Sequence, residues 1–221
     1  MASYSVSLSD LPSRKPASAG RICVFCASSV GANSKYLAEA KSLGQQMAGC
    51  GWGLVYGGTS VGLMGATADA ALAGGAEAIG VLPQGLQDRE IAHRSLTKLH
   101  VVGSMHERKA LMASLSDAFI ALPGGYGTLD EFFEIVTWAQ LNIHFKPCVL
   151  INTDGYYDFL LRFLDHAVRE EFVRPANLGL VHVARNSAEA LQWIEQQRDQ
   201  ASLNQNGEQR AGAQSAGGLR P

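Results

Sequence analysis

The stretch Ala118-Phe-Ile-Ala-Leu-Pro-Gly-Gly-Tyr-Gly-Thr-Leu-Asp-Glu131 combines a short apolar run, a turn with three glycines and the start of a longer amphipathic segment. The apolar run, residues 118–122, is typical of a strand that is covered on both faces. The amphipathic segment predicts a helix over residues 129–142. A strand, a glycine-rich turn and a helix in this order indicate a β–α–β crossover within a parallel sheet.

The same alternation extends in both directions along the chain. The expected strands are residues 22–27, 53–56, 78–82, 99–102, 118–122, 148–152 and 180–184. The expected helices are residues 34–49, 62–73, 105–115, 129–142, 156–171 and 187–197. The sequence therefore predicts an α/β fold with a doubly wound, mostly parallel sheet of about seven strands flanked by helices.

The length of 221 residues suits one domain of this kind. Residues 1–20 are rich in Ser, Ala and Pro, and residues 198–221 are rich in Gln, Asn, Gly and Ala. Both segments lack apolar periodicity, so we expect two flexible tails around a folded domain over residues 21–197.

Bulk charge excludes several function classes. Lys and Arg total 18 and Asp and Glu total 20, so the net charge is −2 and no basic field attracts nucleic acid or an anionic membrane. The N-terminus lacks the apolar core of a signal peptide, and no apolar run is long enough to span a bilayer. We therefore expect a cytoplasmic protein with neither a nucleic-acid nor a membrane partner.

The cysteine pattern Cys23-Val-Phe-Cys26 resembles a metal or redox motif, but it falls in an expected strand. Residues three apart on a strand point to opposite faces, so these two sulfur atoms are expected to be core groups and not shared ligands. No His, Cys or carboxylate cluster elsewhere has the spacing of metal ligands. The sequence predicts no metal and no cofactor.

Three strand-to-helix turns are rich in small residues, and in a parallel sheet such turns meet at the edge where ligands bind. They are Cys26–Gly31, Tyr56–Gly65 and Leu122–Glu131, and candidate binding residues in the first two are Ser28, Gly57 and Gly58. Glycine lets the backbone approach a phosphate, and a helix N-terminus offers free N–H groups. The alternative is that the glycines only permit tight turns, but two glycine-dense turns in one sheet favour a phosphate site.

The ligand is expected to carry a single phosphate. The dinucleotide pattern G-x-G-x-x-G fails because Asp130 stands where a third glycine would follow Gly125 and Gly127. The P-loop pattern fails because Leu63 follows Gly62 where a lysine is required.

Arg108 is a second candidate, because it lies on the apolar face of an expected helix that Ser104 and Glu107 cap. A guanidinium on that face needs an anion, since a buried unpaired charge is costly. The anion is either a structural carboxylate or a ligand phosphate, and the nearby strand end favours the ligand.

Glu131 also has two interpretations. Together with Thr128 it fits a capping box, in which it only caps its helix. It also lies one turn beyond the expected phosphate loop, where a carboxylate stabilises a cationic ribose or transfers a proton.

These residues resemble the motifs of a known family. Pro123–Glu131 resembles the signature PGGxGTxxE of the LOG ("Lonely Guy") family, and Met105-His-Glu-Arg-Lys109 resembles its second motif. Ala27 and Thr59 stand where many members carry glycine. Other matching segments are Val24–Ser29, Tyr56–Gly58, Gly62–Gly65 and Trp138–Leu141, and the resemblance covers residues 20–195.

The resemblance implies a Rossmann-like fold, a homodimer, and hydrolysis of N6-modified AMP to a free base and ribose 5-phosphate. It implies that Arg108 and Glu131 are the catalytic pair. The nucleotide-binding residues that it implies are Glu90, Arg108, Lys109, Gly125, Tyr126, Gly127, Thr128, Leu129, Asp130, Glu131 and Thr137.

Two other classes of function stay open. One is a non-catalytic nucleotide-binding or carrier protein on the same fold. The other is a dinucleotide or ADP-ribose binder, against which the missing G-x-G-x-x-G pattern argues. Members of the family sometimes bear a lysine decarboxylase label, which the chemistry does not favour, because no lysine has a recognisable pyridoxal phosphate setting.

Overall fold

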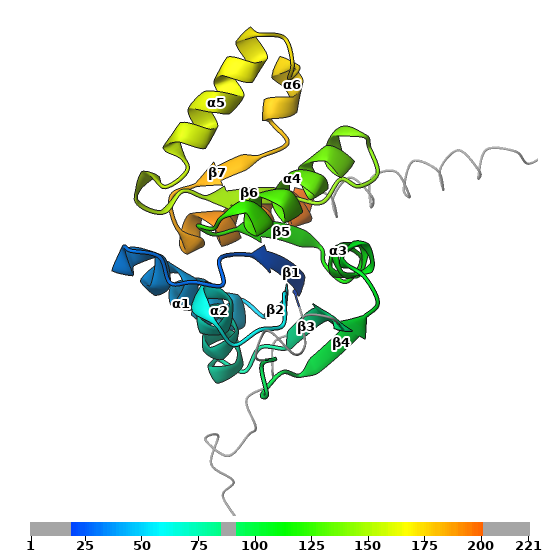
Figure 1. Ribbon diagram of the computed structural model, residues 1–221. Helices are drawn as coiled ribbons and strands as arrows, with labels where there is room; N and C mark the ends of the chain where they lie inside the picture. Colours follow the sequence, from blue (N-terminus) through cyan, green and yellow to red (C-terminus); the bar gives the residue numbers. More distant parts are fainter. Residues whose placement is uncertain (1–18, 85–91, 201–221) are drawn as a thin grey trace, which may run out of the picture.

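The computed structural model describes residues 19–84 and 92–200 (Figure 1). The strands are β1 (Gly20–Phe25), β2 (Trp52–Tyr56), β3 (Ala78–Pro83), β4 (Lys98–Val102), β5 (Ala118–Ala121), β6 (Cys148–Ile151) and β7 (His182–Ala184). The helices are α1 (Ser34–Gly49), α2 (Gly62–Ala73), α3 (Met105–Ser114), α4 (Tyr126–Gln140), the 3₁₀ turn η3 (Thr153–Gly155), α5 (Asp158–Arg169) and α6 (Pro175–Leu178). A further helix occupies residues 187–200.

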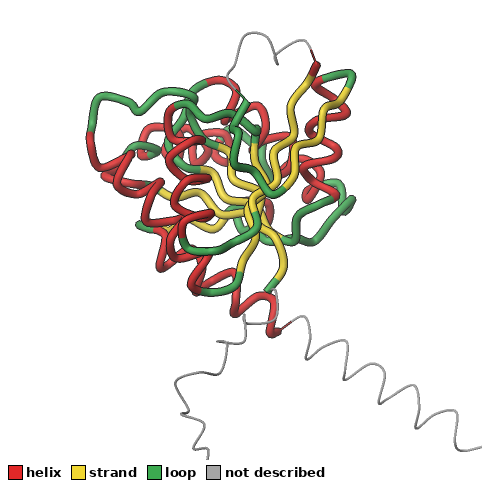
Figure 2. The backbone as a smooth tube through the Cα atoms, turned by 90° about the horizontal axis from the view of Figure 1, so that it is seen from below, coloured by secondary structure: helices red, strands yellow, loops and turns green. Residues whose placement is uncertain are grey.

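The strands form one sheet in the order β4-β3-β2-β1-β5-β6-β7, and every neighbouring pair is parallel. The chain winds outward from β1 to β4, then returns to the other side of β1 and continues to β7. This order reverses between β1 and β5, which makes that boundary the switch point of a doubly wound sheet. The predicted fold class is confirmed, and Figure 2 shows the twisted sheet between helices.

Each face of the sheet has its own core. Ile22 and Val24 of β1 belong to a cluster formed with α1, α2 and the helix over residues 187–200. Cys23 and Phe25 belong to the opposite cluster, which α3 and α4 cover. The period of two along a strand explains this division, and it leaves β1 buried on both faces.

The two cysteines of the CxxC pattern lie in different clusters, as predicted: Cys23 faces α3 and α4, whereas Cys26 faces α1 and α2. Both are free thiols. Within residues 19–84 and 92–200, no three His, Cys, Asp or Glu side chains are grouped so that they could hold a metal ion. Over the same residues, no helix is long and apolar enough to cross a membrane.

Several boundaries differ from the sequence-based expectation. The helix expected over residues 156–171 is shorter and corresponds to α5, and the 3₁₀ turn η3 precedes it, with Asp154 in the left-handed region at φ +54°. The short helix α6 was not expected; Pro175 at its first position fixes a helical φ there. Residues 1–18 and 201–221, most of the two expected tails, lie outside the described residues, as does Glu90.

Candidate functional site

The turns after β1, β2 and β5 meet at the carboxyl edge of the sheet, beside the switch point. The N–H of Ala27 donates to the carbonyl of Pro123 (3.3 Å), which joins the turns after β1 and β5. The turn after β2 packs on the first so closely that a Cβ atom at Gly62 would lie 2.2 Å from the carbonyl carbon of Ser28. Gly62 also has φ +59°, so both space and backbone conformation require glycine.

The start of α2 is not open to a ligand phosphate in the way that the sequence suggested. The N–H groups of Leu63 and Met64 both donate to the carbonyl of Ala27 (3.0 and 3.4 Å). A neighbouring loop thus satisfies the first turn of this helix, and the glycines there serve close packing. For the turn before α2, the contacts therefore favour the alternative interpretation, in which the glycines permit tight packing.

The start of α4 does leave donors available. Within the described part of the chain, the N–H groups of Gly124, Gly125, Tyr126, Gly127 and Thr128 donate no hydrogen bond. The first hydrogen bond of the helix runs from Leu129 N–H to the carbonyl of Gly125 (3.1 Å). A Cβ atom built at Gly125 or Gly127 meets nothing within 4 Å, so the space over this turn is open. A run of such N–H groups at a helix N-terminus suits an anion.

The observed start of α4 also corrects the expected capping box. The helix begins at Tyr126, three residues before the expected position, with Gly125 as its N-cap and no side-chain cap. Thr128 and Glu131 both lie inside the helix, where neither can cap it. The glycines of the turn therefore belong partly to the helix, and the interpretation of Glu131 as a cap is excluded.

Glu131 instead pairs with Arg108 across the interface of α4 and α3. Arg108 Nη1 lies 2.6 Å from Glu131 Oε1, and the two residues are only 8% and 9% exposed. Arg108 Nε donates to the carbonyl of Val81 in β3 (3.0 Å). The buried anion required by Arg108 is thus a carboxylate of the protein, although the other nitrogen of the fork has no acceptor among the described residues.

Burial raises the pKa of Glu131 above its ordinary value, and the opposing effect of the Arg108 cation does not cancel this rise. One oxygen of the carboxylate, Oε2, has no donor in the described ranges. A carboxylate with a raised pKa and one available oxygen suits proton transfer or stabilisation of positive charge.

Gly57 makes room for this pair. A Cβ atom at Gly57 would lie 2.4 Å from Arg108 Nη2, so any side chain there would displace the guanidinium. The sequence pattern predicted that Gly57 binds phosphate. The pattern could not predict that Gly57 lies beside Arg108, because that proximity depends on tertiary structure. Gly58, with φ +83°, packs against the backbone of β3.

The other predicted site residues have different surroundings. Lys109 Nζ lies 3.2 Å from Asp130 Oδ2 and 2.9 Å from Glu134 Oε2, so two carboxylates of α4 hold it. Ser28 and Tyr126 are exposed at the turns. Thr137 lies on an exposed face about three turns along α4, where its hydroxyl donates to the carbonyl of Phe133 (2.7 Å). The structure does not bring the side chain of Thr137 to the start of the helix.

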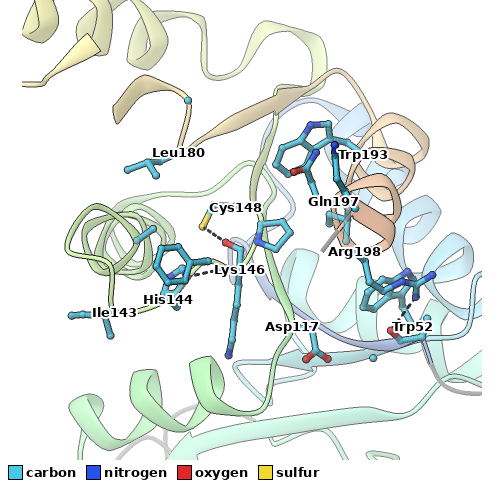
Figure 3. Close-up of a pocket in the computed structure, with 18 of the residues that line it drawn as sticks. Trp52, Asp117, Ile143, His144, Lys146, Cys148, Leu180, Trp193, Gln197 and Arg198 are labelled. Carbon is cyan, nitrogen blue, oxygen red and sulfur yellow. Dashed lines mark hydrogen bonds between the residues drawn. The ribbon is translucent and has the colours of Figure 1, made fainter. Parts of the chain in front are cut away.

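A wide cavity of about 1210 Å³ lies at the opposite edge, where the strands begin. Figure 3 shows Trp52, Asp117, Lys146 and Trp193 among its labelled lining residues. None of the predicted site residues that the structure describes lines it. Ligands of parallel α/β sheets bind at the carboxyl edge, so the Arg108–Glu131 edge is the better candidate.

The chain is similar to known proteins over most of its length. The family described as "Possible lysine decarboxylase" matches residues 64–194. The chain is 52% identical over 176 residues to the probable cytokinin riboside 5′-monophosphate phosphoribohydrolase LOGL5 of Oryza sativa subsp. japonica, covering 80% of this chain and 72% of the relative. It is 48% identical to the corresponding enzyme LOG3 of Arabidopsis thaliana, covering 80% and 82%.

Among solved structures, the Moco carrier protein of Chlamydomonas reinhardtii is similar at a TM-score of 0.60 and 28% identity, covering 80% of this chain and 96% of that one. The molybdenum cofactor binding protein of Rippkaea orientalis is similar at 0.60 and 27%, covering 84% and 98%.

Proposed function

The chain belongs to the family of cytokinin riboside 5′-monophosphate phosphoribohydrolases, and from this premise we propose that it hydrolyses the bond between base and ribose in a nucleoside 5′-monophosphate. The substrate is AMP or an N6-modified AMP, and the products are the free base and ribose 5-phosphate. The observation that carries the proposal is the buried Arg108–Glu131 pair beside the unbonded N–H groups at the start of α4.

We assign the phosphate to the turn before α4. The N–H groups of residues 124–128 supply donors, and the open space over Gly125 and Gly127 admits the anion. The helix dipole adds a favourable potential for negative charge at the same place.

We assign the bond cleavage to Glu131 and Arg108. As the C1′–N bond breaks, positive charge grows on the ribose, and the carboxylate of Glu131 stabilises it. Water adds its oxygen to C1′ and gives up one proton to Glu131, while the base leaves with the bonding electron pair. Glu131 then passes this proton to the base and returns to the carboxylate. Arg108 balances the charge of Glu131 and offers its remaining nitrogen to the phosphate.

The other predicted contacts remain part of the proposal. They are Glu90, Lys109, Ser28, Gly57, Gly58, Tyr126, Leu129, Asp130 and Thr137. A contact from Lys109 to the nucleotide requires Lys109 to exchange Asp130 or Glu134 for the substrate. Gly57 contributes by leaving room for Arg108.

A carrier function is the alternative. It is favoured by the likeness to two proteins named as molybdenum cofactor carrier and binding proteins, at 27–28% identity. The relatives named as hydrolases are closer, at 48–52% identity. The retained Arg108 and Glu131 also favour catalysis, because a carrier needs no buried carboxylate beside the bound ribose.

Chromatography of the products tests the proposal. The protein is incubated with AMP, N6-prenyl-AMP and adenosine, each with and without EDTA. We expect free base and ribose 5-phosphate from the two monophosphates, far less base from adenosine, and no effect of EDTA. Binding of AMP without release of adenine would favour the carrier, and equal rates on AMP and adenosine would refute the phosphate anchor.

We also propose a homodimer located in the cytoplasm. Helix α5 is strongly amphipathic, yet none of its residues is buried, and Phe159 and Phe163 are exposed. Figure 1 shows α5 and α6 beyond the β7 edge of the sheet. An exposed apolar face of this kind is typical of an interface, and a second copy is the occupant that we propose. Four free thiols are compatible with a reducing compartment.

A further inference from the structure

Two adjacent tyrosines hold the turn that precedes α4. The hydroxyl of Tyr157 donates to the carbonyl of Leu122, and the hydroxyl of Tyr156 donates to the carbonyl of Gly124, both at 2.7 Å. Both residues follow β6 and directly precede α5, so they come from a different crossover than the turn itself. Nothing in the sequence pattern singled them out.

The carbonyl between these two is held as well. Pro123 accepts from the N–H of Ala27 in the turn after β1 (3.3 Å). Three consecutive carbonyls, at Leu122, Pro123 and Gly124, thus accept hydrogen bonds from outside the turn. Each peptide plane in this stretch is therefore fixed by a neighbouring element.

Fixing these carbonyls also fixes the N–H groups. In a trans peptide the C=O and the following N–H point in opposite directions. The N–H of Gly124 therefore points away from Ala27, and the N–H of Gly125 points away from Tyr156. Neither has an acceptor in the described part of the chain. The hydrogen bonds that hold the carbonyls thereby direct the first donors of the proposed phosphate site.

The two tyrosines differ in how firmly they are built in. Tyr157 is 2% exposed and packs in the core cluster beneath α3 and α4. Tyr156 is 40% exposed and makes edge-on ring contacts with Tyr157 and with Tyr36 of α1. Burial raises the pKa of the Tyr157 hydroxyl, so it remains a donor throughout the range of an enzyme assay.

We propose that Tyr157 and Tyr156 are positioning residues that hold the anion-binding turn in the orientation that receives the substrate phosphate. The inference rests on the proposed function of that turn. It predicts that removing a hydroxyl weakens recognition of the phosphoribosyl part of the substrate and leaves recognition of the base unchanged. If the two tyrosines only stabilise the fold, removing a hydroxyl should lower the melting temperature without weakening phosphoribosyl binding selectively.

The test measures the binding of ribose 5-phosphate and of adenine, each by calorimetry, to wild type, Tyr157→Phe and Tyr156→Phe. Tyr36→Phe is the control, because its hydroxyl meets no partner among the described residues. We expect ribose 5-phosphate to bind about tenfold more weakly to Tyr157→Phe, the size of one lost hydrogen bond, with adenine binding unchanged. Tyr36→Phe should bind both like wild type.

Unchanged ribose 5-phosphate binding in folded Tyr157→Phe, or equal weakening for adenine, would overturn the proposal. If Tyr157→Phe does not fold, the same criteria apply to the more exposed Tyr156→Phe. Because both probes are products and no turnover is measured, the result is separate from that of the activity assay. A wild-type protein that binds ribose 5-phosphate but releases no adenine from AMP contradicts the proposed function and not the role of the tyrosines.

Discussion

At the scale of single residues, the proposed chemistry depends on a buried charge pair. Arg108 and Glu131 are each about nine-tenths buried and lie 2.6 Å apart. Leaving one buried charge without its partner is strongly destabilising, whereas replacing both with apolar groups is often neutral. This asymmetry separates the contribution of the pair to stability from its contribution to chemistry.

We therefore predict that Arg108→Ala lowers the free energy of unfolding by about 3–5 kcal/mol, because Glu131 is left uncompensated. The double variant Arg108→Met with Glu131→Leu should recover most of that loss and remain inactive. Urea denaturation and the base-release assay on the same samples check both points. An Arg108→Ala protein as stable as wild type would show that water or another group compensates the charge of Glu131.

The raised pKa of Glu131 predicts a pH dependence. The mechanism needs the carboxylate, so activity is present above this pKa and is lost as the pH falls through it. Because burial raises the pKa above the ordinary 4.5, the acid limb of kcat/KM should lie above that value. Asp130→Asn removes a neighbouring negative charge that also raises this pKa, so the limb should move to lower pH. If the acid limb of Asp130→Asn stays at the pH of the wild-type limb, the limb belongs to a titrating group other than Glu131.

At the scale of elements, the start of α4 decides where the ligand phosphate lies. Two glycines of this turn differ sharply in their surroundings. A Cβ atom at Gly127 meets nothing within 4 Å, whereas one at Gly124 would lie 2.0 Å from Thr128 Oγ1. Gly127 leaves space for a ligand, whereas Gly124 leaves space for the side chain of Thr128.

Gly127→Ala should therefore keep or raise stability, by up to about 1 kcal/mol, because alanine restricts the unfolded chain and fits the helix. It should still raise KM for AMP, since the methyl group occupies the ligand space. Gly124→Ala should lower stability by more than 1 kcal/mol through the clash with Thr128. Melting curves and KM values for the two variants check this contrast, and a Gly127→Ala protein with normal KM would place the phosphate elsewhere.

The elements also show what the sequence could predict. The period of two along β1 predicted that Cys23 and Cys26 face opposite sides, because it depends only on local geometry. The apolar face of α3 predicted that Arg108 is buried. The same pattern could not identify Glu131 as its partner, since that contact joins two helices. The start of α4 was misplaced because Gly125 and Gly127 were taken as turn residues throughout.

At the scale of the whole molecule, the unpartnered face of α5 predicts self-association. We expect a dimer in analytical ultracentrifugation, and a monomer for Phe163→Glu, which places a charge in the centre of the apolar face. Asp165→Ala, on the same helix, serves as the control and should remain dimeric. A wild-type monomer at micromolar concentration would contradict the proposed dimer.

The most direct test of the central claim is the rate at which Glu131→Gln releases adenine from AMP, measured beside wild type at equal folded concentration. Since α4 begins at Tyr126, Glu131 has no capping role to lose, and glutamine keeps its shape and one acceptor for Arg108. We predict that turnover falls about 100-fold or more while ribose 5-phosphate still binds. A Glu131→Gln protein with near-normal turnover would contradict this prediction and remove Glu131 from the chemistry.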